Sequence, residues 1–409
     1  MGTLHENTTA RVFTNIAELA TPAEILRDAA LVVAADGTVA WHGERAALPA
    51  EYASWPTHDL EGAAVVPGLV DAHTHLIWAG DRLDEYVLRS QGASYEEILE
   101  SGGGIHNTTR ATQAASEADL LRTAKQRAEI FLRGGVTSLE VKSGYGMTLE
   151  AELKMLRVAK QLADEVPQRI VPTFLAHVVP HGEERAPFVD MVVKELIPEV
   201  ARQELAVAVD VFCDRGAYTL AEARRVLETA KEHGLEVKAH AEQLSHTGVS
   251  RLVAELGGLS ADHLEQVTPE DWEKLAEAGT VGTVLPGATI LLHKPFPPAR
   301  AMWDDGVKVA VATDHNPGSS PFYSLALAMQ LAQVHGGLSA PEALLAGTAH
   351  AADALGRSEL GRLAPGSAAD FLVLHEPRAY SLLYRWGHVP LRAAYIAGTC
   401  RLDLASALA

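Results

Sequence analysis

PGLVDAHTHL, residues 67–76, is the stretch on which the prediction of the fold depends. An apolar run over 64–73 predicts a buried strand, and it ends in Asp71, His73 and His75. Residues two apart on a strand point to the same face, so both imidazoles can reach one ion. The pair therefore indicates a metal site, although two hydrogen-bonded core histidines would give the same pattern.

Seven further apolar, β-branched-rich runs follow, and helical stretches such as 149–165 and 219–234 separate them. Thr219 and Glu222 form a capping-box pattern at the start of the second of these helices. Continuous apolar strands are typical of a parallel sheet covered by helices, and eight βα units predict a (β/α)8 TIM-like barrel. A doubly wound open sheet is the competing prediction, which the lack of a GxGxxG sequence after the first strand weakens. The seven runs are 135–143, 169–177, 206–213, 235–242, 259–264, 280–286 and 307–314.

Both ends of the chain resemble each other in pattern, with short strands broken by glycine and proline. Residues 30–43 form two apolar runs around Asp36 and Gly37, which is a strong hairpin signal. We predict that 1–66 and 357–409 pair into one small β-sandwich domain, and that the barrel occupies 67–356.

Composition excludes several classes of protein. The formal net charge of −19 argues against nucleic acid, which requires a basic face. The sequence contains no run of 18 apolar residues, so no transmembrane helix and no membrane partner are expected. Two cysteines, Cys213 and Cys400, are too few for a disulfide framework. Together with a start that lacks the features of a signal peptide, they favour a cytosolic protein.

The active site of a barrel lies at the carboxyl ends of its strands, and reactive side chains are found at these ends here. His73 and His75 end the first strand, His240 the fifth and Asp314 the eighth. Three neutral imidazoles and one carboxylate suit Zn²⁺ or Fe²⁺ and leave room for a water. We therefore predict one divalent metal on these four residues, with hydroxide as the nucleophile and Asp314 also as proton acceptor.

Three other candidates allow two interpretations each. His263 is either a core histidine or a group that orients the attacking water, and His177, which ends the third strand, is ambiguous by itself. Arg82 either forms a surface ion pair with Asp84 or Glu85, or holds a substrate carboxylate with two hydrogen bonds.

Two loops also bear on the site. Gly102-Gly103-Gly104 is either a lid or a backbone cradle for an anion. Residues 316–321, NPGSSP, form a turn whose amides and hydroxyls would lie beside the metal.

At these residues the sequence resembles the amidohydrolase superfamily and, more narrowly, the imidazolonepropionase family. PGLVDAHTHL is typical of the superfamily, and the narrower likeness rests on RLDEYVLRSQGASYEEILESGGGI, LEVKSGYG, KAHAEQLS and ATDHNPGSSP. The resemblance implies hydrolysis of the ring amide of 4-imidazolone-5-propanoate to N-formimidoyl-L-glutamate, in histidine degradation, by a homodimer. It implies one zinc or iron ion on the four predicted ligands, with help from His263. It implies that substrate contacts come from Arg82, Tyr145, His177, Gln243, Asn316, Gly318 and Ser319.

The chain departs from the family pattern at two positions. His315 stands where phenylalanine is frequent, and we expect it to face away from the metal because strand neighbours alternate. Gln243 stands where some members have glutamate, so we assign it a substrate contact only. The fourth strand offers no late lysine to bridge two metals, which favours one metal. Lys142, on the second strand, is expected to support the following loop.

Two other functions are compatible with the barrel. One is another amidohydrolase, such as a nucleobase deaminase or a different cyclic amidase. Those deaminases typically use a glutamate three residues after the histidine of the fifth strand, and Gln243 occupies that position here. The other is a metal-binding scaffold without catalysis, against which the complete set of predicted ligands argues.

Overall fold

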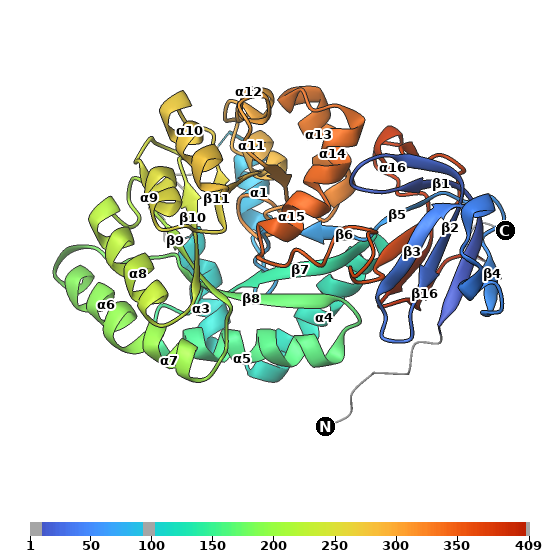
Figure 1. Ribbon diagram of the computed structural model, residues 1–409. Helices are drawn as coiled ribbons and strands as arrows, with labels where there is room; N and C mark the ends of the chain where they lie inside the picture. Colours follow the sequence, from blue (N-terminus) through green and yellow to red (C-terminus); the bar gives the residue numbers. More distant parts are fainter. Residues whose placement is uncertain (1–9, 93–102, 406–409) are drawn as a thin grey trace.

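In the computed structural model, which describes residues 10–92 and 103–405, eight parallel strands follow one another around a barrel (Figure 1). Each strand pairs with the strands before and after it in sequence, without the change of direction that a doubly wound sheet requires. The predicted (β/α)8 barrel is therefore confirmed. Its strands are β6 (Leu69–Asp71), β7 (Val136–Lys142), β8 (Arg169–Ala176), β9 (Ala208–Phe212), β10 (Glu236–Ala241), β11 (Ser260–His263), β12 (Val281–Val284) and β13 (Val309–Val311).

The barrel closes just beyond the last residues of β6 and β13. Thr74 and His315 form a parallel bridge there. The Asp314 amide donates to the His73 carbonyl at 3.0 Å, and the His75 amide donates to the His315 carbonyl at 2.9 Å. Closure therefore takes place through the residues that flank the predicted metal ligands.

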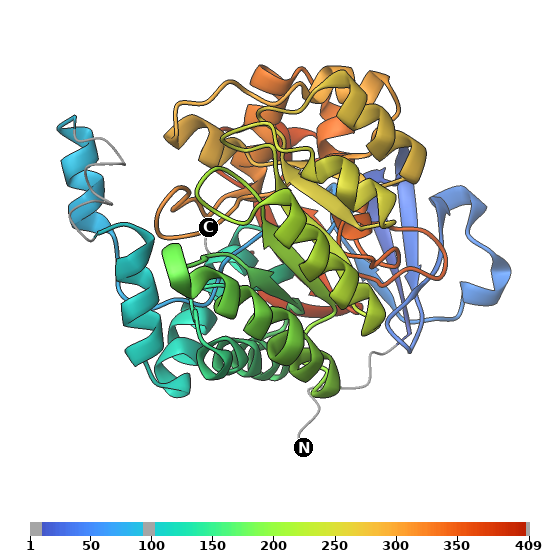
Figure 2. The same cartoon turned by 90° about the vertical axis from the view of Figure 1, so that its left-hand side faces the viewer.

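Helices cover the outside of the barrel, as Figures 1 and 2 show. Helix α8 begins with the predicted capping box between Thr219 and Glu222. In Figure 2, α1 projects from the body of the barrel beside α3. The helices are α1 (Leu83–Ser90), α3 (Ile105–Ala114), α4 (Glu117–Arg133), α5 (Leu149–Glu165), α6 (Arg185–Met191), α7 (Ile197–Arg202), α8 (Leu220–Glu232), α9 (Val249–Glu255), α10 (Pro269–Ala278), α11 (Pro286–Leu291), α12 (Ala299–Asp304), α13 (Leu325–Gly336), α14 (Ala340–Ala346), α15 (Ala349–Asp353) and α16 (Ser381–Tyr384).

The two ends of the chain form one mixed sheet beside the barrel, as expected for a small domain built from both termini. Its strands lie in the order β16-β15-β14-β5-β1-β2-β3, with β4 on β1, so they share a single hydrogen-bonded sheet. The predicted hairpin is the antiparallel pair β2–β3. The strands are β1 (Arg11–Ala20), β2 (Ile25–Val33), β3 (Val39–Glu44), β4 (Thr57–Asp59), β5 (Val65–Pro67), β14 (Phe371–Leu374), β15 (Leu391–Ile396) and β16 (Thr399–Asp403). The domain boundaries stay a prediction.

The predicted continuous strand over 64–73 is divided in the structure. Residues of β5 pair with β14 of the small sheet, whereas β6 pairs with β7 of the barrel. The chain changes sheets at Gly68, where a Cβ atom would lie 2.2 Å from Oγ1 of Thr137. The close approach of the Thr137 side chain to the backbone at this position explains the glycine.

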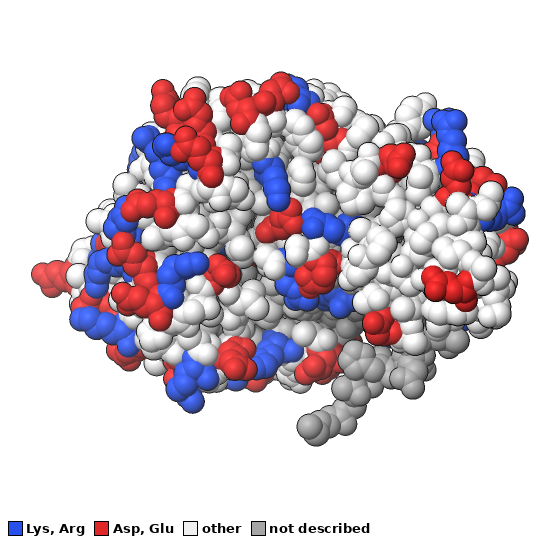
Figure 3. Space-filling view, in the orientation of Figure 1, with Lys and Arg blue, Asp and Glu red and all other residues white. Residues whose placement is uncertain are grey.

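The charge on the surface and the hydropathy of the helices both agree with the expectation from the sequence of neither a nucleic-acid partner nor a transmembrane helix. Lys and Arg alternate with Asp and Glu over the face shown in Figure 3 rather than forming one basic area. None of the helices in the described part of the chain is both long and apolar enough to cross a bilayer.

Candidate metal centre and active site

The four predicted metal ligands meet at the carboxyl ends of the barrel strands. Nε2 of His73 lies 3.1 Å from Nε2 of His240 and 3.6 Å from Oδ1 of Asp314. Nε2 of His75 lies 3.3 Å from the same carboxylate oxygen. Two ligand atoms at about 2.0–2.1 Å from a tetrahedral zinc lie roughly 3.3 Å apart. The observed separations therefore match the spacing that one divalent ion requires.

The chemistry of these donors also fits a metal. All four residues are at most 3% exposed, and Oδ1 of Asp314 is a buried carboxylate oxygen without a hydrogen-bond donor. Burial, followed by the nearby Lys142 ammonium, lowers the pKa of His75 to about 3. Burial lowers the pKa of His240 to about 4, against the opposing effect of Asp210. These imidazoles are thus neutral near pH 7, as metal ligands must be.

Two carboxylates that the sequence interpretation did not assign hold two of the ligand imidazoles. Oδ2 of Asp262 lies 2.7 Å from Nδ1 of His73, and Oδ1 of Asp210 lies 3.1 Å from Nδ1 of His240. Such contacts orient the ring and leave Nε2 to the metal. Asp210 stands in the apolar run AVAVDVFC, where only alternation along a barrel strand marks it as facing inward.

The prediction from the sequence that Lys142 supports the following loop is wrong. Its side chain is fully buried inside the barrel, with Nζ 2.6 Å from Asp210 and 2.8 Å from Glu140. As a residue near the end of β7, it points into the barrel, where the carboxylates of neighbouring strands lie. The loop is instead held by Glu152, which accepts from the amides of Gly144 and Met147 at 2.8 and 3.1 Å.

His263 lies against the ligand cluster. Its ring centroid is 5.3 Å from that of His240, and Nδ1 faces Oε2 of Glu265 at 3.8 Å. Burial alone lowers the pKa of this imidazole, but Glu265, followed by Asp314, raises it above its ordinary value. A histidine with this environment can hold a proton beside the metal site.

Strained backbone is concentrated here. His263 has φ of 87° and Asp314 has φ of 53°, values that side-chain-bearing residues rarely adopt. Glu242, with φ of 54°, turns its carboxylate away from the site. There it accepts from the amide of Thr247 at 2.6 Å and from the hydroxyl of Ser250 at 2.9 Å.

Two predicted substrate contacts, Tyr145 and His177, lie beside the imidazoles. Tyr145 is 4% exposed, with its ring centroid 5.9 Å from that of His75 and 5.6 Å from that of His177. His177 in turn lies 5.7 Å from His75, and its Nδ1 is buried without a partner. Gln243 is 7% exposed, three residues after His240. Tyr145 and His177 thus form one wall of the metal site.

Arg82 forms the ion pair with Glu85 that one of its two interpretations predicted, and its contact with a substrate carboxylate stays a prediction. Its Nε donates to Glu85, the predicted ion pair, while its guanidinium packs on Gly318. A Cβ atom at Gly318 would lie 2.5 Å from Nη1, so only glycine leaves room for this arrangement. Glu85 also accepts from the Gly104 amide at 2.9 Å and from Asn107 at 3.0 Å. Gly102 of the predicted glycine loop lies outside the described residues.

The 316–320 turn is built by Asn316. Its amide nitrogen donates to the Asp314 carbonyl at 2.8 Å and to Oγ of Ser319 at 2.9 Å. Its side-chain oxygen accepts from the amides of Gly318 and Ser319, each at 2.8 Å. The side chain therefore shapes the loop, and a direct substrate contact from Asn316 stays a prediction.

His315 faces away from the ligands, as predicted. Its ring centroid lies 4.1 Å from that of Tyr323 and 5.4 Å from that of Phe131 on α4, and 1% of the residue is exposed. Here histidine takes the place of an aromatic core residue.

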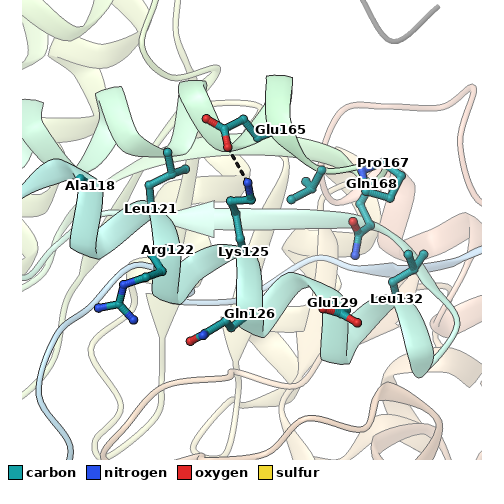
Figure 4. A pocket seen from close by; sticks show the side chains of 11 residues that line it. Ala118, Leu121, Arg122, Lys125, Gln126, Glu129, Leu132, Glu165, Pro167 and Gln168 are labelled. Atoms are coloured by element: carbon teal, nitrogen blue, oxygen red, sulfur yellow. Dashed lines mark hydrogen bonds and ion pairs between the residues drawn. The ribbon is translucent and has the colours of Figure 1, made fainter.

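A large surface hollow lies elsewhere on the molecule. It has a volume of about 590 Å³ and is lined by residues of α4, the end of α5 and the segment 166–168 that leads to β8. Figure 4 shows Lys125 and Glu165 paired across it, at 2.6 Å. The predicted site residues are not among the residues that line it, so it is not the active site.

Comparisons with known proteins agree with this geometry. A sequence profile of the amidohydrolase family matches residues 64–387. Imidazolonepropionase of Deinococcus deserti is 47% identical over 95% of this chain and 98% of its own. The enzyme of the same name from Deinococcus radiodurans is 46% identical with the same coverage, and that of Cupriavidus pinatubonensis is 46% identical over 91% of this chain and 89% of its own. The chain belongs to the imidazolonepropionase family of amidohydrolases.

Solved structures with a similar fold support the architecture of this chain but do not indicate its substrate. An adenosine deaminase from Xanthomonas campestris with bound zinc superposes with a TM-score of 0.70 at 20% identity, over 98% of this chain and 96% of its own. A triazine hydrolase variant superposes with a TM-score of 0.74 at 18% identity, over 96% and 95%. At this identity the likeness shows the barrel and its flanking sheet alone.

Replacement of one ligand tests the metal centre. We expect His240→Ala to retain far less zinc than the parent protein after dialysis, because one of three neutral imidazole donors is lost. His315→Phe is the matched control, since it replaces a buried imidazole beside Asp314 that packs away from the cluster. Metal analysis of the dialysed proteins measures both, and equal zinc contents would remove His240 from the ligand set.

The metal-free protein should reveal the depressed histidine pKa values. The pKa of His75 lies at about 3 when folded and near 6.5 when unfolded, so the unfolded chain binds its proton first as the pH falls. The contribution of His75 to stability is therefore complete above pH 6.5 and decreases as the pH falls toward 3. With chelator present, the Tm of the parent protein should fall relative to that of His75→Asn between pH 6.5 and 4.5. Parallel Tm curves would contradict this assignment.

Proposed function

We propose that this chain hydrolyses 4-imidazolone-5-propanoate to N-formimidoyl-L-glutamate. The observation that carries the proposal is the cluster of three neutral imidazoles and one carboxylate beside Tyr145, in a chain 46–47% identical to proteins named imidazolonepropionase over nearly their whole length. In this reaction the water oxygen forms a bond to the ring carbonyl carbon, the ring C–N bond breaks, and the leaving nitrogen takes up a proton.

The ligands that we propose for one divalent ion per subunit, zinc or iron, are His73, His75, His240 and Asp314. When bound, such an ion lowers the pKa of water and polarises a carbonyl group. The three imidazoles contribute no charge and the carboxylate contributes one negative charge. With a divalent ion bound, the ion and its four ligands together would carry a net positive charge, which would stabilise the negative oxygen of the transition state.

We assign proton handling to Asp314 and His263. With Oδ1 of Asp314 on the ion, the second carboxylate oxygen would accept the proton of the attacking water. Burial raises the pKa of this carboxyl in the metal-free protein. His263 polarises the bond under attack, and the charges that raise its pKa favour the protonated ring.

Orientation of the substrate is assigned to the surrounding wall. The guanidinium of Arg82 would hold the propanoate, because its Nη groups extend beyond the ion pair that Nε makes with Glu85. Tyr145 and His177 would flank the ring, with Gln243 as a further polar contact. Gly318 and Ser319 would offer backbone and hydroxyl groups from the turn that Asn316 builds.

Cellular context follows from the same proposal. We place the enzyme in the cytosol, where the thiols of Cys213 and Cys400 stay free, as they are in the structure. A homodimer is proposed on the family resemblance. An enzyme of this activity would act in histidine degradation.

A nucleobase deaminase is less well supported. Those amidohydrolases typically carry a glutamate where this chain has Gln243, and the neighbouring Glu242 is occupied by the Thr247–Ser250 segment. The chain therefore lacks a free carboxylate at the place where such enzymes shuttle protons.

Direct assay tests the proposal. Purified, metal-loaded protein is mixed with the imidazolone made in place from urocanate by a urocanase. Loss of the ring chromophore and formation of formimidoyl-glutamate, both abolished by chelator or by His73→Ala, are the expected results. Ammonia released from guanine or cytosine, with the imidazolone untouched, would replace the proposal with a deaminase.

Arg82 should determine affinity for the substrate carboxylate. We expect Arg82→Met to lower kcat/KM for the imidazolone propanoate about 10- to 150-fold, the value of a charge-assisted hydrogen bond of roughly 1.5–3 kcal/mol. A ring substrate without the carboxylate is the control, and its kcat/KM should change little. A loss of the same size for both substrates would mean that Arg82 only supports the loop.

A further inference from the structure

The barrel interior next to the metal ligands contains a cluster of five charged side chains: Glu140 and Lys142 on β7, Asp210 on β9, Lys238 on β10 and Asp262 on β11. Each of them is at most 1% exposed. Buried charges are expensive unless they are paired, so the arrangement of these five groups must be well defined. The proposed reaction uses none of them directly.

Lys142 connects this cluster to a metal ligand. Its ammonium lies 2.6 Å from Oδ2 of Asp210, 2.8 Å from Glu140 and 3.9 Å from Asp262. Through its other oxygen, Asp210 accepts from the backbone amide of His240 and contacts Nδ1 of the ring, both at 3.1 Å. A chain of contacts therefore runs from the ammonium through one carboxylate to a metal-binding imidazole.

Lys238 is equally buried but is connected differently. Its ammonium lies 2.9 Å from Glu140 and 3.0 Å from the Ala72 carbonyl, with Asp262 at 3.5 Å. Its described contacts do not include Asp210. The two lysines thus allow one buried ammonium to be compared with another in the same interior layer.

The carboxylates around Lys142 form a set that would attract a cation. His73, Asp210 and Asp262 each offer a donor atom within 4.8 Å of the others. Lys142 already supplies a positive charge within reach of both carboxylates. Because this charge is covalently fixed, it offsets the negative charges of Asp210 and Asp262 without a second metal ion.

We propose that Lys142 is a positioning residue for the metal, holding Asp210 against Nδ1 of His240 so that Nε2 of this ring is presented to the ion. The carboxylate keeps Nδ1 protonated, which selects the tautomer with a lone pair on Nε2. Without the ammonium, Asp210 is a buried carboxylate with one partner fewer, so its position against the imidazole is less well fixed. The inference concerns metal binding alone and does not depend on which substrate is hydrolysed.

The test measures zinc, without substrate, on Lys142→Met. The dissociation constant is obtained by competition with a chromophoric zinc chelator, and the Tm of the metal-free protein is measured in parallel. We expect zinc to bind about 10- to 100-fold more weakly, the usual effect of losing an outer contact of a metal ligand. The metal-free Tm should fall as well, because Glu140 and Asp210 lose a counter-charge.

Two further variants separate positioning from stability. Lys238→Met removes a buried ammonium that does not touch Asp210 but lies 3.5 Å from Asp262, the carboxylate on Nδ1 of His73. Its metal-free Tm should fall, and its zinc affinity should fall less than that of Lys142→Met, because this contact is longer than the 2.6 Å pair of Lys142 with Asp210. The double variant Lys142→Met with Asp210→Asn removes both charges. It should regain much of the lost Tm without regaining zinc affinity, because a neutral amide holds the imidazole more weakly.

Recovery of zinc affinity together with Tm in the double variant would overturn the proposal, and so would parent-like affinity in Lys142→Met. An equal loss of affinity in Lys238→Met would overturn it too, since any buried lysine would then serve. If Lys142→Met does not fold, the zinc affinity and the metal-free Tm of the double variant are compared with those of Asp210→Asn instead. Failure of the imidazolone assay would leave these results untouched.

Discussion

The contact between the first and last strands is the constraint on which the site depends. Three metal-ligand positions lie within two residues of the Thr74–His315 bridge, and the fourth, His240, comes from the opposite part of the strand order. Only a closed barrel brings these positions together, since they are far apart in an open sheet of the same order. The hydrogen bond from the Asp314 amide to the His73 carbonyl thus closes the fold and sets the spacing of two ligands.

Exclusion of water and the pairing of fixed charges act together inside the barrel. Burial keeps the imidazoles neutral, so they are ready for a metal, but the same burial makes every unpaired carboxylate costly. The structure meets both demands by placing two ammonium groups among Glu140, Asp210 and Asp262. The backbone strain at His263 and Asp314 is a further cost that this rigid surrounding supports.

The barrel and the ligand set were largely predictable, because both follow from local rules. The apolar runs with polar ends indicate parallel strands, and the HxH spacing places His73 and His75 on one face. The roles of Asp210 and Lys142 were not predictable, because they depend on partners on other strands that only the register brings together. Gly68 shows the same limit: the apolar pattern continues through it, while contact with Thr137 divides the strand between two sheets.

The pairing of β5 with β14 has a consequence for synthesis on the ribosome. Pro67 and Phe371 are neighbours in the sheet but are separated by about 300 residues of chain. At roughly 5–20 residues per second, β5 waits on the order of 15–60 s for its partner strand to emerge. During that time the backbone hydrogen-bonding groups along this edge of β5 have no strand to pair with. The small sheet therefore becomes complete only when nearly the whole chain has been synthesised.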